Sequence, residues 1–89
     1  MNTRIPTRGH EARLNITLHG QNGDLVDPVP FGASDAELRR WAAEAVRSGS
    51  VPGVSAQRAS FADFIVDRFP ASDAVPFHRI FLRPSTPFG

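Results

Sequence analysis

Residues 77–83 have the sequence FHRIFLR. If this run is a strand, apolar residues lie on both of its faces. In an extended chain, Ile80 and Leu82 point to one face, and Phe77 and Phe81 point to the other. A strand that is apolar on both faces is typical of the interior of a sheet rather than its edge. The run therefore predicts a central strand close to the end of the sequence.

The six residues that follow, PSTPFG at 84–89, are expected to form an exposed tail that ends on Gly89. Two prolines favour an extended backbone in this tail. Glycine has no side chain to obstruct a nucleophile that attacks its carboxylate. The tail is thus a candidate reactive end, provided that the rest of the chain builds a suitable platform for it.

Composition predicts a single small domain. The chain has 89 residues, of which 40% are hydrophobic and 21% charged, as in soluble globular proteins. It contains no apolar stretch of about 18 residues that would span a membrane, and its polar first ten residues contain no signal core. A cytoplasmic protein without membrane contact is expected. The absence of cysteine excludes disulfides and thiolate metal sites.

All ten basic residues are arginine, and they are spread among nine acids to give a net charge of +1. Nucleic-acid binding requires several phosphates to be neutralised together, so this composition argues against it. The lack of lysine also removes any side-chain amine for Schiff-base chemistry or lysine-linked conjugation on this chain. Catalysis by the chain is not expected, because the sequence has no nucleophile elbow and its three histidines lack metal-ligand spacing.

The N-terminal half predicts a β-hairpin after an arm of residues 1–11. Residues 12–18 alternate, with Leu14, Ile16 and Leu18 on one face. The Asn22-Gly23 pair predicts the hairpin turn, since both residue types tolerate positive φ. The return strand is expected at residues 25–29, at a sheet edge, because its prolines cannot donate to a ladder.

Residues 34–48 predict the only long helix. Ser34 and Glu37 form a capping-box pattern, and Gly49 is a typical C-terminal stop. An apolar stripe at helical spacing predicts the buried face, with Trp41 at its centre as a core residue. The stripe consists of Leu38, Trp41, Ala42, Ala45 and Val46.

Residues 60–69 fit either a second amphipathic helix or a strand. The helical alternative places Phe61, Phe64 and Ile65 on one face, whereas a strand places Phe61 with Ile65. The β-branched pair at 65–66, the short length and the proline at position 70 favour the strand. A loop at residues 50–59 would connect it to the helix.

A hairpin, one helix, a Pro-containing loop at 51–53, a further strand and a central last strand follow the order of the β-grasp fold. In this order and pattern, residues 12–89 resemble the ubiquitin-like modifiers, and in particular divergent bacterial ubiquitin-like proteins. The resemblance implies an α+β domain at residues 12–83, in which a hairpin and one amphipathic helix pack on a mixed four-stranded sheet. Residues 84–89 would be its exposed tail.

The resemblance further implies that the chain is a substrate of other enzymes. A partner would adenylate Gly89 with ATP, a conjugating enzyme would take it on a thiol, and a target protein would receive it. The chain itself would need no cofactor. The family usually ends in Gly-Gly, so Phe88 would require a partner whose tail-binding tunnel admits a ring.

The sheet face away from the helix is the expected docking surface for these partners. The partner-binding candidates are Ile65, Phe77, Arg79, Phe81 and Arg83, and His78 is a further candidate for this surface. Two alternatives share the fold: a sulfur carrier that uses Gly89, and a non-catalytic interaction or assembly module such as a phage protein. Self-association through the proline-bearing edge strand also stays open.

Overall fold

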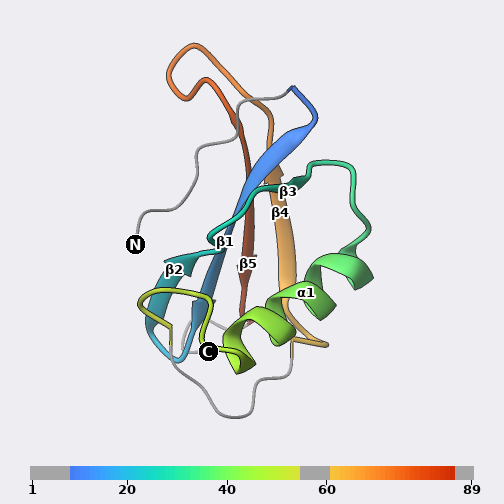
Figure 1. Cartoon of the computed structure of the whole chain (residues 1–89). Helices are drawn as coiled ribbons and strands as arrows, with labels where there is room; N and C mark the ends of the chain where they lie inside the picture. Colours follow the sequence, from blue (N-terminus) through green and yellow to red (C-terminus); the bar gives the residue numbers. More distant parts are fainter. Residues whose placement is uncertain (1–8, 55–60, 86–89) are drawn as a thin grey trace.

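The structure is a computed structural model that describes residues 9–54 and 61–85. One helix lies against one side of a twisted sheet (Figure 1). In chain order the elements are β1 (Glu11–Leu18), β2 (Gln21–Asp24), β3 (Val29–Pro30), α1 (Asp35–Arg47), β4 (Ile65–Phe69) and β5 (His78–Arg83).

The sheet is mixed, with the strand order β2-β1-β5-β4. The two central strands, β1 and β5, are parallel, and β5 pairs with β4 in the antiparallel sense. The prediction that β5 lies inside the sheet is therefore confirmed. The architecture is α+β, with one helix packed on a mixed sheet.

Within the described residues the sheet has five strands, so the predicted count of four is wrong. Both β2 and β3 pair with β1, at residues 15–18 and 11–12 respectively. The chain leaves the ladder between them, after a last backbone hydrogen bond from Leu25 N to Leu14 O. Pro28 has no N–H to donate, which helps to explain why the return strand is divided.

The hairpin turn lies earlier than predicted. His19 and Gly20 occupy it with φ values of 51° and 76°, the signs that a two-residue type I′ turn requires. The predicted turn residues, Asn22 and Gly23, belong to β2, and the return strand begins at residue 21 rather than 25. In β2, Asn22 donates a hydrogen bond from Nδ2 to Asn15 Oδ1 at 2.8 Å.

The helix prediction is confirmed at both ends. Ser34 is the N-cap of α1, and its hydroxyl accepts a hydrogen bond from the Glu37 backbone N–H at 3.1 Å. The Glu37 carboxylate in turn accepts from the Ser34 backbone N–H, which completes the capping box. Ser48 is the C-cap, and Gly49 follows with a φ of 76°. These contacts are local, so the sequence specifies them directly.

The ambiguous segment forms a strand, as favoured. β4 begins only at Ile65, after a turn in which the Phe64 backbone N–H bonds to Phe61 O. The expectation that Phe61 shares a strand face with Ile65 is wrong, because Phe61 precedes the strand and is buried in the core. There it meets Phe64 edge to face, with ring centroids 4.6 Å apart.

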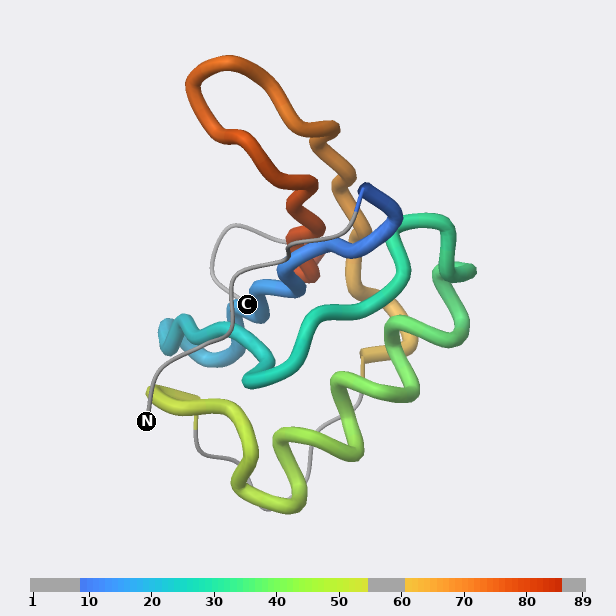
Figure 2. Tube along the Cα trace, turned by 45° about the horizontal axis from the view of Figure 1, so that its top comes forward, coloured from blue at the N-terminus to red at the C-terminus, as the bar shows by residue number. Residues whose placement is uncertain are grey.

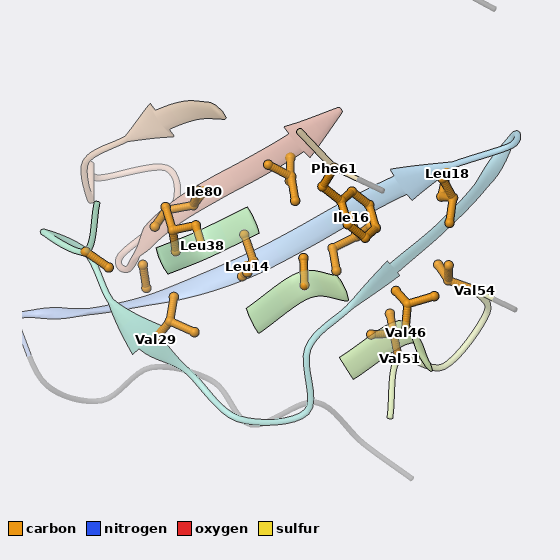
Figure 3. Close-up of a cluster of buried hydrophobic side chains, with 14 residues drawn as sticks. Leu14, Ile16, Leu18, Val29, Leu38, Val46, Val51, Val54, Phe61 and Ile80 are labelled. Atoms are coloured by element: carbon orange, nitrogen blue, oxygen red, sulfur yellow. The ribbon is translucent and has the colours of Figure 1, made fainter. Parts of the chain in front are cut away.

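The hydrophobic core fills the space between the sheet and α1 (Figure 3). β1 contributes every second residue to it, β5 contributes Ile80 and Leu82, and α1 contributes Leu38, Ala42 and Val46. Figure 2 shows the helix to one side of the strands, and the connection between β4 and β5 extending beyond the rest of the described chain. The sheet face opposite α1 is not covered by any element within the described residues.

No helix in the described part of the chain is long and apolar enough to cross a membrane.

Candidate docking face

The sheet face opposite α1, here called the open face, carries alternate residues of β1, β5 and β4. Cross-strand register puts Arg79 of β5 between Arg13 of β1 and Phe69 of β4. Residues that are directly opposite each other in a sheet project to the same face. Two strands side by side therefore place two arginines next to each other at the centre of the open face.

Arg79 lies against aromatic rings. Its guanidinium carbon is 5.5 Å from the ring centroid of Phe69 and 5.8 Å from that of Phe81. The two rings meet edge to face with centroids 5.4 Å apart. Within the described residues, its buried Nε has no hydrogen-bond partner.

Arg13 has a similar environment. Its guanidinium carbon lies 4.6 Å from the centroid of the Phe77 ring, in a cation–π arrangement. Its Nε is 3.9 Å from Asp24 Oδ2, a distance that allows charge attraction but no hydrogen bond. This Nε is also buried without a hydrogen-bond partner among the described residues.

Acidic groups on the open face are already engaged near its margins. Asp67 accepts a hydrogen bond from Arg83 Nε at 2.7 Å. Asp24 accepts one from the Asn15 side chain, also at 2.7 Å. The two pairs therefore flank the central arginines without supplying a hydrogen-bond acceptor to the Nε of either one.

The structure brings together four of the five predicted partner-binding residues on the open face. Ile65 is opposite Arg83, and Phe81 is flanked by Asn15 and Asp67. The fifth, Phe77, precedes β5 and lies under Arg13. Sequence reasoning missed Arg13 and Phe69 as members of this cluster. The outward position of Arg13 was readable from alternation, but its place beside Arg79 depends on the register of strands far apart in sequence.

His78 does not belong to the open face, so the expectation for this residue is wrong. It is opposite Ala12, on the side of the sheet that faces the helix, and its ring stacks on Phe31 at 4.2 Å. Its Nδ1 accepts a hydrogen bond from the Ala71 backbone N–H at 2.9 Å. Its Nε2 lies 2.7 Å from Gly9 O, so the network assigns the ring proton to Nε2.

The expected activation residues, Phe88 and Gly89, lie outside the described residues. The tail can be followed only to residue 85, directly after β5.

A shallow apolar groove of about 380 Å³ lies on the helix side, beside the divided edge strand. Trp41 lines it together with Leu25 and Pro28. Trp41 was predicted to be a core residue, but it is only half-buried and packs against the core from its margin. Its side chain both packs against the core and lines the groove.

In residues 9–54 and 61–85, no three His, Asp or Glu side chains are grouped as metal ligands. Comparisons with protein-family models, with curated proteins and with solved structures found no match to this chain. The sheet topology and the chemistry of the open face are therefore the features from which a function can be inferred.

Proposed function

We propose that this chain has a β-grasp fold and acts as a ubiquitin-like protein modifier, which other enzymes activate at Gly89. The observation that carries the proposal is the strand order β2-β1-β5-β4 with a parallel central pair. This order is compatible with a β-grasp sheet in which β2 and β3 together take the place of the second hairpin strand. A fold alone does not fix a function, so the modifier role rests on this topology together with the sequence resemblance.

The position of β5 supports the proposal. As a central strand it is paired with β1 up to Leu82 and with β4 up to Arg83. The residues that follow are thereby attached to a rigid part of the domain, which limits the entropy lost when an enzyme binds them. In the proposed reaction, an adenylating enzyme joins the Gly89 carboxylate to AMP from ATP and releases pyrophosphate. A thiol then displaces AMP, and a target nucleophile displaces the thiol.

The test is a search for covalent adducts in the cells that produce the chain. An N-terminally tagged wild type is compared with a variant that lacks Gly89 and with Gly32→Ala, a control substitution that leaves the sequence of the tail unchanged. The proposal expects SDS-stable adducts with wild type and the control, and none without Gly89. Trypsin does not cut between arginine and proline, so a modified target should carry residues 80–89 on one side chain, detectable by mass spectrometry.

The open face favours one second candidate, a non-catalytic module that binds partners without a covalent step. Arginine and aromatic side chains, which this face combines, are enriched at protein interfaces. If the wild-type chain is abundant in the cells and forms no adduct, the modifier proposal is wrong. Partners that co-purify equally well without Gly89 would then identify a binding module.

A further inference from the structure

We propose that the open face binds an acidic segment of a partner protein, with its carboxylates held by Arg79 and Arg13. This inference deepens the protein-binding part of the proposed function and rests on it. It does not require Gly89, and it would hold equally for a modifier or for a non-covalent module.

The first argument is the position of the two arginines. Arg13 and Arg79 are directly opposite each other on adjacent parallel strands. Like charges at such positions destabilise a sheet, and the aromatic contacts of each arginine offset only part of this cost. A partner segment that crosses the two strands could offer one carboxylate to each guanidinium group, which would add an attraction at each position.

Both side chains also have an Nε without a hydrogen-bond partner among the described residues. The Nε of Arg13 and that of Arg79 are buried, so a partner's carboxylate would bind the outer Nη atoms of the two guanidinium groups. Two other arginines of the chain donate hydrogen bonds to backbone carbonyl oxygens. Arg39 donates from Nε and Nη2 to Phe64 O, at 3.1 and 2.8 Å.

Arg68 behaves like Arg39, since its Nη1 donates to Phe31 O at 2.8 Å. The two central arginines of the open face are thus the exceptions among these four. Guanidinium groups bind carboxylates through two parallel N–H donors, which gives both strength and orientation. The aromatic rings of Phe69, Phe77 and Phe81 limit the motion of the guanidinium groups and leave an apolar margin for aliphatic side chains next to the bound acid.

The same observations disfavour a nucleic acid on this face. Single-stranded nucleic acids stack their bases on free aromatic faces and need several phosphates neutralised. Here the Phe77 ring is covered by Arg13, and the rings of Phe69 and Phe81 contact each other. Asp24 and Asp67 lie on the same face and would repel a phosphate backbone. A short peptide with one or two acids avoids this repulsion.

The experiment is a backbone-amide NMR titration of the full chain. The probe is an acetylated octapeptide with two glutamates, at its third and fifth positions, and serine or leucine at the other positions. The comparison ligands are the same peptide with glutamine for glutamate and a single-stranded oligothymidine of eight nucleotides. The inference expects shifts in β1, β5 and β4, with at least about tenfold weaker binding of the glutamine peptide and of the oligonucleotide.

Variants locate the binding site. Arg79→Gln shortens the side chain, keeps a polar end group and removes the charge, so it should weaken binding of the glutamate peptide about tenfold. Arg47→Gln, in the exposed last turn of α1, is the matched control and should bind as wild type does. An unchanged amide spectrum away from residue 79 shows that the variant is folded.

Three results would overturn the inference: equal binding of the glutamate and glutamine peptides, shifts confined to α1 or the groove, or tighter binding of the oligonucleotide. Failure here is separable from failure of the modifier proposal. Adducts that need Gly89, without a preference for acidic peptides, would remove only the present inference. Acid-selective binding without adducts would remove only the modifier.

Discussion

Replacing Gly23 with alanine should destabilise the fold through a steric clash, although Gly23 lies inside a strand and not in a turn. A Cβ at this position would lie 2.1 Å from the Pro52 carbonyl oxygen, 3.0 Å from Val51 Cγ1 and 3.2 Å from Val54 Cγ2. An ordinary carbon–oxygen contact is roughly 3.3 Å or longer. The loop at residues 51–54 must therefore move away from β2 by about 1 Å to accept the methyl group.

The cost follows from what this loop buries. Val51 and Val54 are only 2% and 5% exposed, and they close the end of the core between β2 and α1. Fully burying a valine contributes about 1.5–3 kcal/mol, so partial exposure of both side chains should cost about 2–4 kcal/mol. For a domain of this size, that corresponds to a fall in Tm of roughly 8–30 °C.

Urea unfolding followed by the fluorescence of Trp41, the only tryptophan, measures the change. Gly32→Ala is the matched control, because nothing lies within 4 Å of its Cβ and its φ is not positive. It should be neutral or stabilising by up to about 1 kcal/mol. Gly20→Ala, with a φ of 76°, should lose about 1 kcal/mol through backbone strain alone. If Gly23→Ala unfolds within about 0.5 kcal/mol of the Gly32 variant, the steric reasoning is refuted.

Four further substitutions test other parts of the fold by the same unfolding measurement. Ser34→Ala removes the N-cap acceptor of α1 and should cost about 1 kcal/mol; no loss would mean that the capping box is not formed. Leu14→Ala, at a fully buried position, should cost about 2–5 kcal/mol, whereas Phe69→Ala, 43% exposed, should cost clearly less; the reverse order would contradict the assigned faces of the sheet. Arg68→Gln should lower the free energy of unfolding by about 1 kcal/mol, since it removes a charged donor to a backbone carbonyl at a half-exposed site. A larger loss of stability at high salt than at low salt would argue against this ionic contribution.

Local patterns predicted the elements that depend on local contacts. The capping box at Ser34 and Glu37 and the glycine after Ser48 specify both ends of α1 with contacts a few residues apart. The central position of β5 followed from apolar residues on both of its faces. Each of these features can be read without knowing any neighbour in space.

The turn of the hairpin was mispredicted because distant contacts decide it. Asn22-Gly23 is the stronger turn signal, yet the chain turns at His19-Gly20. Gly23 lies where the Pro52 carbonyl oxygen comes too close for any side chain. The Asn22 side-chain amide donates a hydrogen bond across the hairpin to Thr17 Oγ1 at 2.9 Å. Neither the approach of the loop nor the cross-strand register is encoded in the local sequence.

In the candidate site, too, local patterns predicted some features and contacts between distant residues decided the others. Alternation alone predicts that Arg79, Phe81 and Arg83 share one face of β5. The pairing of Arg79 with Arg13, on which the proposed acid-binding site depends, requires the parallel register of two strands from opposite ends of the domain. His78 was misplaced because the docking hypothesis grouped it with its neighbours in sequence, although alternation puts it on the helix side.

The late position of β5 in the sequence has a consequence for synthesis of the chain. While the ribosome is still making residues before 78, β1 has no neighbour on one side and β4 has no partner at all. The hairpin and α1 can form early, but half of the core stays open to water, and an unpaired edge of β1 is available to other chains. Completion of the sheet must wait for the last strand to leave the exit tunnel. The hairpin and α1 can therefore form before the core is complete, but the core closes only after β5 is available to pair with β1 and β4.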